Sequence, residues 1–435
     1  MRMKERSRNL GLALSLSLSC GAMASDHGDG PIPVSLERDG DRFYLQRGGE
    51  PYVVKGAGIE FGDKTHFAAR GGNSFRTWRT DNGVQTGQEV LDEALALGLT
   101  VVMCIEIIPE RKGFDYDDEE AVRKQFEYAR GEVMKYKDHP ALLAWMIGNE
   151  PNLFFENPKV FDAINDIASM IDEVDPNHPT TTALAGFSGE LADLIETRAP
   201  ALDFLSIQMY GDIVNLPRYI EQTGFTRPYM VTEWGSIGHW EVGKTSWDAP
   251  IEQNSTDKAN NYLHSYEVAI ASNPQQIVGN YVFLWGQKQE RTPTWYGMFL
   301  EEGQSTAAVD TMEYLWTGEW PENRAPKIED IILDGKKPAD SVTLKPGQVV
   351  EATVASSDPD GAPLTWRWVL KEESQATEAG GDKEKVPEII TGRLEGEAGR
   401  AVLTAPEAPG AYRLFVYTED EGGSAAHANI PFLVR

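Results

Sequence analysis

The sequence predicts an α/β protein in which a (β/α)₈ TIM barrel is followed by an all-β sandwich. Three observations support this prediction: a length of 435 residues, eight apolar runs separated mostly by helical patterns, and a C-terminal region of short strands and turns. The length exceeds one ordinary domain and fits a barrel with one small domain. Hydrophobic residues make up 41% of the chain, which is enough for sizeable cores.

Continuous apolar runs mark the eight expected barrel strands. Such runs are typical of strands buried on both faces of a parallel sheet. With their crossover helices they cover about 270 residues, the usual size of this barrel. An open doubly wound sheet is the alternative, but the chain lacks a glycine-rich phosphate turn after its first run. The runs are residues 52–59, 74–78, 100–105, 142–147, 181–184, 204–209, 229–231 and 277–284.

Helical and hairpin patterns fill the segments around these runs. The clearest helix starts near Asp118 and ends before Pro140. Between them, apolar residues recur at steps of four and three, as one face of a helix requires. Ahead of the barrel, residues 34–55 alternate around an Asp-Gly turn, which predicts a hairpin that could plug the barrel bottom.

The character of the sequence changes near residues 322–326. Short alternating strands follow, at residues 348–354, 364–370, 401–404 and 413–417, with turn signals between them. We therefore expect the barrel and its hairpin at residues 31–322 and an immunoglobulin-like β-sandwich at residues 325–435. A charged, glycine-containing stretch at residues 371–388 predicts a long mobile loop. The sandwich is expected to brace the barrel, with glycan binding as the alternative.

The N-terminus has the pattern of an export signal. Four basic residues precede a short apolar run, and a small-residue cleavage site follows at Ala22-Met23-Ala24. Residues 1–24 are thus predicted to be a signal peptide, and the protein to be exported to the periplasm or beyond. Lipoprotein anchoring through Cys20 is the less favoured alternative, because no leucine stands three residues before it. Cleavage would leave Cys104 as the one mature cysteine, without an intrachain disulfide.

The composition excludes several classes of partner. A formal net charge of −28 argues against nucleic acid and against anionic membranes, since phosphate groups are bound by clustered Lys and Arg. The apolar N-terminal run is too short to span a bilayer, and no later segment resembles a span. The histidines lack metal-ligand spacing, so neither a metal nor another cofactor is expected. The Asp-Pro-Asp-Gly stretch at residues 358–361 favours a turn over a calcium site.

Two glutamates end apolar runs on different sides of the expected barrel. Glu150 follows the fourth run and Glu233 follows the seventh. In such barrels the active site lies at the C-terminal ends of the strands, so both carboxyl groups should face one mouth. Retaining hydrolysis of a glycosidic bond needs two carboxyl groups, one as acid/base and one as nucleophile. Charged strand ends that merely meet solvent are the alternative for either residue alone.

The sequences around these glutamates resemble glycoside hydrolase clan A, whose members are retaining TIM-barrel glycosidases. Residues 145–151 (WMIGNEP) look like the Asn-Glu signature of the clan, and residues 231–235 (VTEWG) look like its nucleophile strand. Residues 71–78 (GGNSFRTW) and 137–143 (KDHPALL) are similar to stretches of the family 2 catalytic barrel. Family 2 enzymes usually carry sandwich domains before the barrel, whereas this sandwich follows it. The solitary barrel looks closer to members acting on β-1,3-glucan.

The resemblance implies roles for individual residues. Glu150 would be the acid/base and Glu233 the nucleophile. Asn149 would bind the 2-hydroxyl of the reacting sugar, and Arg76 would lie beside the nucleophile. Tyr210 would donate a hydrogen bond to the nucleophile. Trp285 ends the eighth run and would be the aromatic platform of the reactive subsite.

Further candidates follow from loop positions alone. Sugars bind aromatic faces through their apolar CH patches, while polar groups fix their orientation. Aromatic candidates for subsites are Trp78, Trp240 and Trp295, and His239 could touch substrate because it lies near the nucleophile in sequence. Glu60 and Glu106 end the first and third runs and could hold sugar hydroxyls. Loop packing or a solvated rim charge is the alternative for each.

The sequence thus predicts a secreted retaining β-glycoside hydrolase. Its expected substrate is a neutral polysaccharide or oligosaccharide, with β-glucan favoured. A glucanosyltransferase with the same residues is one alternative, because only the acceptor differs. A glycan-binding surface protein with a decayed site is another, although Glu150, Asn149, Arg76 and Glu233 are all intact.

Overall fold

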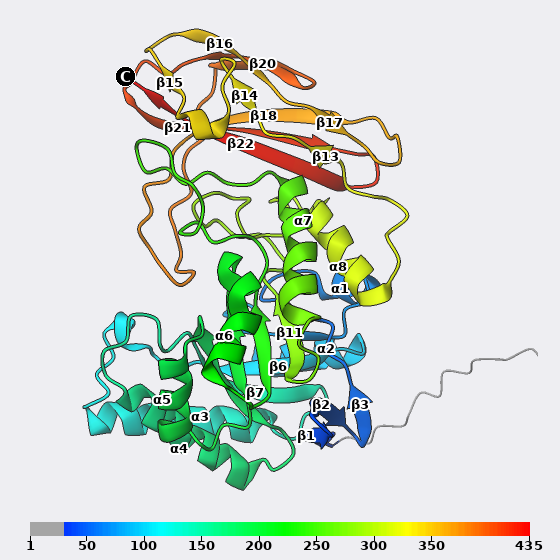
Figure 1. Cartoon of the computed structure of the whole chain (residues 1–435), viewed down its shortest axis with the longest axis vertical. Helices are drawn as coiled ribbons and strands as arrows, with labels where there is room; N and C mark the ends of the chain where they lie inside the picture. Colours follow the sequence, from blue (N-terminus) through cyan, green and yellow to red (C-terminus); the bar gives the residue numbers. More distant parts are fainter. Residues whose placement is uncertain (1–29) are drawn as a thin grey trace, which may run out of the picture.

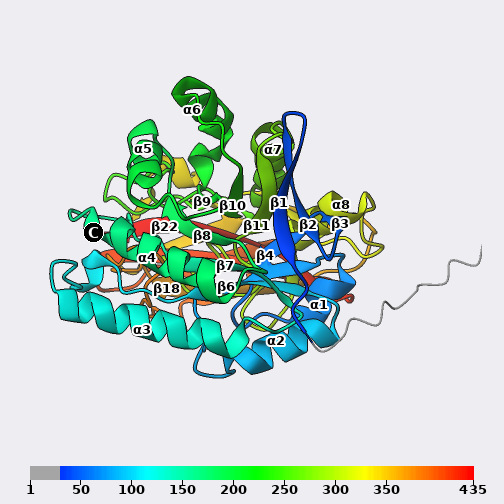
Figure 2. The same cartoon turned by 90° about the horizontal axis from the view of Figure 1, so that it is seen from below.

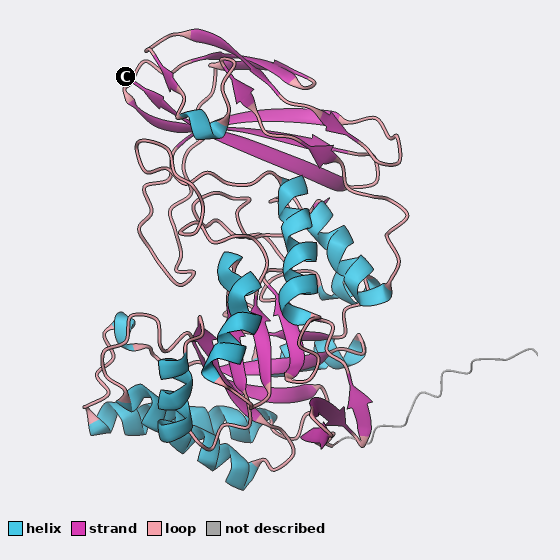
Figure 3. Ribbon diagram, in the orientation of Figure 1, coloured by secondary structure: helices cyan, strands magenta, loops and turns pink. Residues whose placement is uncertain are grey.

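The protein consists of a barrel with a β-sandwich stacked against one of its ends (Figures 1 and 3). The computed structural model describes residues 30–435. The predicted signal peptide and Cys20 lie outside the described residues. Within the described part of the chain, no helix combines the length and apolarity needed to cross a membrane.

Eight parallel strands close the barrel in the order β10-β11-β4-β5-β6-β7-β8-β9. Each strand lies within or overlaps one predicted run, so the fold-class prediction is confirmed. The first run was placed too early, because its beginning at Tyr52 belongs to the preceding hairpin. The strands are β4 (Gly56–Gly58), β5 (Ser74–Arg76), β6 (Thr100–Ile105), β7 (Leu142–Asn149), β8 (Thr180–Ala185), β9 (Leu205–Gln208), β10 (Tyr229–Glu233) and β11 (Ile277–Val282).

Helices surround the barrel and cover its outer face. Trp145 and Ile147 on β7 pack outward against them, whereas Ala144 and Met146 point into the barrel interior. Burying each large apolar side chain stabilises the fold by about 1.5–3 kcal/mol. The helices are α1 (Lys64–Ala69), α2 (Gly87–Ala96), α3 (Glu119–Tyr136), α4 (Lys159–Val174), α5 (Gly189–Arg198), α6 (Leu216–Thr223), α7 (Ser255–Ser265) and α8 (Ala307–Thr317).

Helix α3 shows why the sequence pattern succeeded. The Asp118 side chain caps it by accepting hydrogen bonds from the backbone N–H groups of Glu120 and Ala121. Such a cap contributes about 1 kcal/mol. The predicted apolar face packs on the barrel, with Ala129 and Val133 fully buried.

A hairpin closes the bottom of the barrel, as predicted. Its strands β1 (Val34–Asp39), β2 (Arg42–Arg47) and β3 (Glu50–Tyr52) form a small antiparallel sheet. Figure 2 shows it in dark blue across the lower end of the barrel. Val34 and Leu45 pack against interior residues of the barrel such as Leu143, so the hairpin shields that core from solvent.

The C-terminal region is a β-sandwich with its own core. One sheet contains β22 (Ser424–Val434), β21 (Gly410–Glu419) and β18 (Thr365–Glu372), flanked by β15 (Thr343–Leu344). The other has the order β14 (Ile332–Leu333), β16 (Val349–Thr353), β20 (Arg400–Thr404), β19 (Leu394–Glu397). A further pair joins β13 (Lys327–Ile328) to β17 (Ser356–Ser357).

The barrel and the sandwich share a sheet. Strand β12 (Ser305–Thr306), which lies between the last barrel strand and α8, pairs in parallel with the start of β22. The loop between β18 and β19, expected to be free and mobile, instead lies against the barrel. Its carbonyl and carboxylate groups accept hydrogen bonds from barrel residues such as Arg111 and Arg291. The charges of this loop have partners almost a hundred residues or more away in the chain, which no local sequence pattern indicated.

Candidate active site

Glu233 is the centre of a buried polar cluster at the mouth of the barrel. It is the last residue of β10 and is 5% exposed. Its Oε1 accepts hydrogen bonds from Arg76 Nη1 at 3.2 Å and from Trp78 Nε1 at 3.0 Å. The Tyr210 hydroxyl donates to Oε2 at 2.7 Å. Three donors therefore fix the orientation of this carboxylate.

Arg76 connects this carboxylate to the end of β7. Its side chain is 0% exposed, and a buried cation is stable only when it is paired and hydrogen-bonded. Besides Glu233, it donates from Nη2 to Asn149 Oδ1 at 2.8 Å. Its guanidinium also lies 4.5 Å from the ring centre of Trp78, a cation–π distance.

Asn149 is held with its carbonyl oxygen facing the cluster. The oxygen accepts from Arg76 and from Gln208 Nε2, the latter at 2.9 Å. Because both partners are donors, the amide nitrogen of Asn149 must be on the other side and keeps its hydrogens for another acceptor. Gln208 was not predicted, although a polar residue inside an apolar run is the signal that could have revealed it.

Glu150 follows β7 directly and has a left-handed backbone, with φ of 49°. For a residue with a Cβ this conformation costs of the order of 1–3 kcal/mol, and such strain concentrates at functional sites. Burial raises the pKa of the Glu150 carboxyl to about 8, and the nearby negative charge of Glu233 adds to the shift. Arg111 and Arg76 act in the opposite direction. Glu150 is therefore protonated at neutral pH.

The two carboxyl groups meet different environments. Glu233 is bound by three donors, one of them cationic, whereas Glu150 is half-buried and its charged form is repelled by the charge of Glu233. Environments that move the pKa values of two carboxyl groups apart in this way produce one acid and one base in the same site.

Trp285 does not face the mouth, so its prediction as the platform was wrong. It is 0% exposed and packs between barrel and helices, 5.3 Å from the Phe67 ring and 5.6 Å from that of Trp316. The prediction placed Trp285 at the end of the eighth strand, but strand β11 ends three residues earlier, at Val282. Phe283, which was not singled out, packs at the mouth against Trp78 and Tyr210 instead.

Other aromatic candidates divide into packed and accessible rings. Trp295 is buried and donates from Nε1 to the Ile237 carbonyl, so it is not an open platform. Trp240 is 56% exposed and stands edge-on to Tyr210, with 5.6 Å between ring centres. His239 lies edge-on to Trp240, and burial lowers the pKa of its imidazole to about 4, so the ring is neutral.

The two remaining candidates lie at the rim. Glu60 pairs with Arg79 Nε at 2.9 Å, which satisfies its charge. Glu106 follows β6 and is exposed, and its charge acts on Cys104 and Tyr128. The structure therefore does not bring either residue into the cluster around Glu233.

Comparison with known proteins agrees with this geometry. The family model for the glycosyl hydrolases family 2 TIM barrel domain matches residues 83–310, just over half of the chain. The chain belongs to this family. Its clan, glycoside hydrolase clan A, is the one that the motifs around Glu150 and Glu233 resemble.

Two plant proteins are similar to parts of this family 2 chain. A putative mannan endo-1,4-beta-mannosidase 4 of Arabidopsis thaliana is 40% identical over 57 residues, which are 13% of this chain and 14% of the relative. A putative mannan endo-1,4-beta-mannosidase 9 of Oryza sativa subsp. japonica is 33% identical over 111 residues, 22% of this chain and 27% of the relative. The chain thus spans well under a third of either relative.

Solved structures are similar over more of the chain at lower identity. Bacteroides uniformis beta-glucuronidase 2 matches with a TM-score of 0.49 and 13% identity, over 92% of this chain and 48% of that one. A putative beta-galactosidase from Bacteroides fragilis matches with a TM-score of 0.47 and 14% identity, over 92% and 57%.

Proposed function

We propose that the protein is a retaining β-glycoside hydrolase that acts by double displacement. The observation that carries the proposal is the contrast between Glu233, bound by three donors, and Glu150, whose pKa burial raises to about 8. A carboxylate held in place suits a nucleophile, and a protonated carboxyl beside it suits a general acid.

The first step forms a bond between a Glu233 oxygen and the anomeric carbon of the sugar. The bond from that carbon to the leaving oxygen breaks, and Glu150 gives its proton to this oxygen. In the second step Glu150 takes a proton from water as the water attacks the anomeric carbon and releases Glu233. The free amide hydrogens of Asn149 suit a hydrogen bond to the sugar 2-hydroxyl, which strengthens as positive charge develops on the ring.

The substrate we propose is a neutral β-linked polysaccharide, with β-glucan first. Two basic side chains at the rim are already paired, Arg111 with Asp382 and Lys288 with Glu290, which disfavours their use in recognition of a uronate. The exposed ring of Trp240 offers a stacking surface. A β-glucosyl ring carries its hydroxyls equatorially, so both of its faces present CH groups to such a surface.

A β-1,4-mannan is the second candidate. It is favoured by the two plant relatives, both of which are described as putative mannan endo-1,4-beta-mannosidases. Transfer of the glycosyl group to a sugar instead of water uses the same residues, and longer products from a defined oligosaccharide would reveal it.

A substrate screen followed by product analysis tests the proposal. The full-length protein is incubated with β-1,3-glucan, mixed-linkage glucan, mannan, xylan and nitrophenyl β-glycosides. On the best substrate, proton NMR of the first products should show the β-anomer before mutarotation. An α-anomer formed first would contradict double displacement, and binding without turnover on every substrate would support a decayed glycan-binding site.

Export of the protein is also a proposal, supported by the basic and apolar pattern of residues 1–24. Expression of the full gene product with an N-terminal sequence analysis of the secreted fraction tests it. Cleavage after Ala24 is the expected result, while a lipid-modified Cys20 would favour the lipoprotein alternative.

A further inference from the structure

A loop of the sandwich crosses to the mouth of the barrel. We call residues 373–389, between β18 and β19, the sandwich loop. At its base Lys371 and Ile389 form an antiparallel bridge, so the loop leaves the sandwich as a closed hairpin-like segment. Figure 1 shows it in orange-brown, reaching down from the sandwich towards the barrel.

On the β11 side, Arg291 binds the sandwich loop at several points. Its guanidinium donates to the carbonyl oxygens of Ala376 and Glu378. Its backbone N–H donates to Glu384 Oε2 at 2.6 Å, and the Glu384 side chain is buried. One barrel arginine thus holds both the outgoing and the returning arm of the loop.

On the opposite side, the loop is bound by the segment that follows β6. Arg111 Nη1 lies 3.1 Å from Asp382 Oδ2, and Lys112 pairs with the same carboxylate. Arg111 also lies beside the Ala379 carbonyl, at 3.5 Å. These contacts mean that the loop is attached to the barrel at both ends of its span.

The tip of the loop fits between these two sides. A Cβ at Gly380 would lie 2.8 Å from Arg111 Nη2 and 2.9 Å from Leu153 Cδ2, and its φ of +63° also favours glycine. A Cβ at Gly381 would lie 2.6 Å from Lys288 Nζ, which donates to the Gly381 carbonyl at 2.9 Å. Leu153 follows β7 and Lys288 follows β11, and these strands are on opposite sides of the eight-stranded ring. The glycine pair therefore lies across the mouth.

Both anchoring sites lie near the candidate active site. The charge of Arg111 acts on the carboxyl of Glu150, only three residues from Leu153. Lys288 Nζ lies 5.7 Å from the ring centre of Phe283, which packs edge-on against Trp78. The loop thus lies beside the groups that surround the reacting bond rather than at a distant part of the rim.

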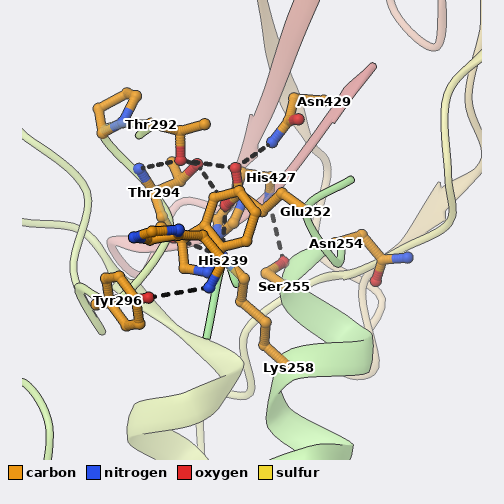
Figure 4. Close-up of polar contacts among 12 residues, drawn as sticks. His239, Glu252, Asn254, Ser255, Lys258, Thr292, Thr294, Tyr296, His427 and Asn429 are labelled. Atoms are coloured by element: carbon orange, nitrogen blue, oxygen red, sulfur yellow. Dashed lines mark hydrogen bonds and ion pairs between the residues drawn. The ribbon is translucent and has the colours of Figure 1, made fainter. Parts of the chain in front are cut away.

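A buried interface holds the sandwich in the orientation that this loop needs. At the root of the loop, Glu373 pairs with Arg413, whose Nη2 donates to the barrel carbonyl of Pro250 at 2.8 Å. Figure 4 shows the neighbouring contacts, in which Asn429 of the sandwich donates to Glu252 of the barrel at 2.6 Å. Because the interface is buried and contains several hydrogen bonds and ion pairs between barrel and sandwich, the loop is carried by a fixed support.

We infer that the sandwich loop closes one side of the catalytic mouth, so that the site accepts the ends of glycan chains and excludes their internal bonds. This inference rests on the proposed function. A glycan chain that is bound through an internal bond must extend out of the site in two directions. A loop fastened across the mouth blocks one of these directions and leaves the other open. The sandwich is then a specificity-determining part of the active site, in addition to bracing the barrel.

The test compares the full-length protein with a variant in which residues 376–382 are replaced by two glycines. Loop length has a weak effect on chain entropy, so this variant should fold. Asp382→Asn, which weakens only the far attachment, is a second variant that keeps the loop length. Lys383→Ala is the matched control, because Lys383 is an exposed side chain of the same loop.

Soluble mixed-linkage glucan and galactomannan are the polymer probes, and nitrophenyl β-glucoside and β-mannoside are the small ones. Viscosity and released reducing ends are followed together. The full-length protein and Lys383→Ala should release reducing ends with little loss of viscosity. The shortened variant should lose viscosity about tenfold faster per reducing end, while its kcat/KM on the active small glycoside stays within about threefold of wild type. Asp382→Asn should lie between them.

The outcomes separate the two proposals. If the intact protein already cuts internal bonds, or if the shortened variant gives the same ratio as the intact one, the loop inference is overturned while the hydrolase assignment stands. If no protein turns over any probe, the proposed function fails and the loop inference falls with it.

Discussion

Two polar clusters in this molecule contain the same kinds of side chains but have different roles. The site cluster at the mouth contains Glu233, Arg76 and the protonated Glu150. The interface cluster between barrel and sandwich is built around Glu252 and Lys258, both buried. Each has a carboxylate, a cation and hydrogen-bonding side chains around them.

The clusters differ in the pKa values of their carboxyl groups. Glu252 accepts from Lys258, from Thr292 at 2.6 Å, from Thr294 at 2.9 Å and from Asn429 at 2.6 Å (Figure 4). Burial alone would raise the pKa of Glu252, but the charge and hydrogen bond of Lys258 outweigh it and lower the pKa to about 2. The site cluster instead keeps a carboxyl with a raised pKa and a strained backbone. The interface cluster therefore stabilises the docking of the two domains, whereas the site cluster keeps a protonated carboxyl beside a charged one.

The largest expected effect is on catalysis, from Glu233→Gln. The amide keeps the shape of the side chain but cannot attack the anomeric carbon, so kcat should fall by about 10⁴-fold. The melting temperature should fall as well, because the amide leaves the buried Arg76 without its charged partner. Steady-state kinetics on a small glycoside and calorimetry measure the two effects. A variant with near wild-type kcat would show that Glu233 is not the nucleophile.

Glu252→Gln should lower stability and leave the reaction rate unchanged, whereas the main effect of Glu233→Gln is on the rate. It leaves the buried Lys258 without its counter-charge, which typically costs about 3–5 kcal/mol. Urea denaturation should show a lower midpoint, while kcat of the folded protein on a small glycoside changes little. Adding Lys258→Met should restore part of the lost stability, because the unpaired charge is then gone. An unchanged midpoint would mean that the interface cluster contributes nothing to docking.

The site cluster could be predicted largely from the sequence because its residues end apolar runs. A charged residue at the end of a buried strand is a local signal, and the barrel brings such ends together, so Glu150 and Glu233 were found. The same reasoning failed at Trp285, because it took the end of the apolar run as the end of a barrel strand, whereas β11 ends at Val282.

The interface cluster and the sandwich loop could not be predicted in this way. Glu252 and Asn429 are 177 residues apart, and Arg111 and Asp382 are 271 apart. Neither pair has a periodic pattern that would reveal a contact, and charged, glycine-containing loops usually remain solvated. Their partners are set by how the two domains dock, which is a tertiary property.

The clusters should also give stability opposite dependences on pH. The folded protein keeps the Glu150 proton up to about pH 8, while an unfolded glutamate loses it near pH 4.5, so stability should fall as pH rises through that window. The contribution of Glu252 is full above about pH 4.5 and is lost as pH falls towards 2. Burial lowers the pKa of His427 to about 3, so this interface histidine also destabilises the fold as pH falls below about 6.5.

Thermal unfolding between pH 3 and 9 checks these signs. Glu150→Gln should remove the decline between pH 4.5 and 8, and it should also remove the loss of kcat/KM as pH rises through about 8. Glu252→Gln should flatten the acid side of the profile instead. Matching profiles for the two variants would contradict the assignment of different roles to the clusters.

The smallest expected effect is that of Trp240→Ala at the rim of the site cluster. The ring is 56% exposed, so its removal should leave the melting temperature within error, as for most surface substitutions. Loss of an aromatic contact of about 0.5–1.5 kcal/mol should raise KM for a polysaccharide about threefold to tenfold, with little change in kcat. Trp320→Ala is the matched control, because this tryptophan is 39% exposed but stacks on Tyr314 beside α8. Equal KM values for both variants would mean that Trp240 does not contact the polysaccharide. The sandwich loop would then be the one feature of the rim that determines which glycan chains are bound.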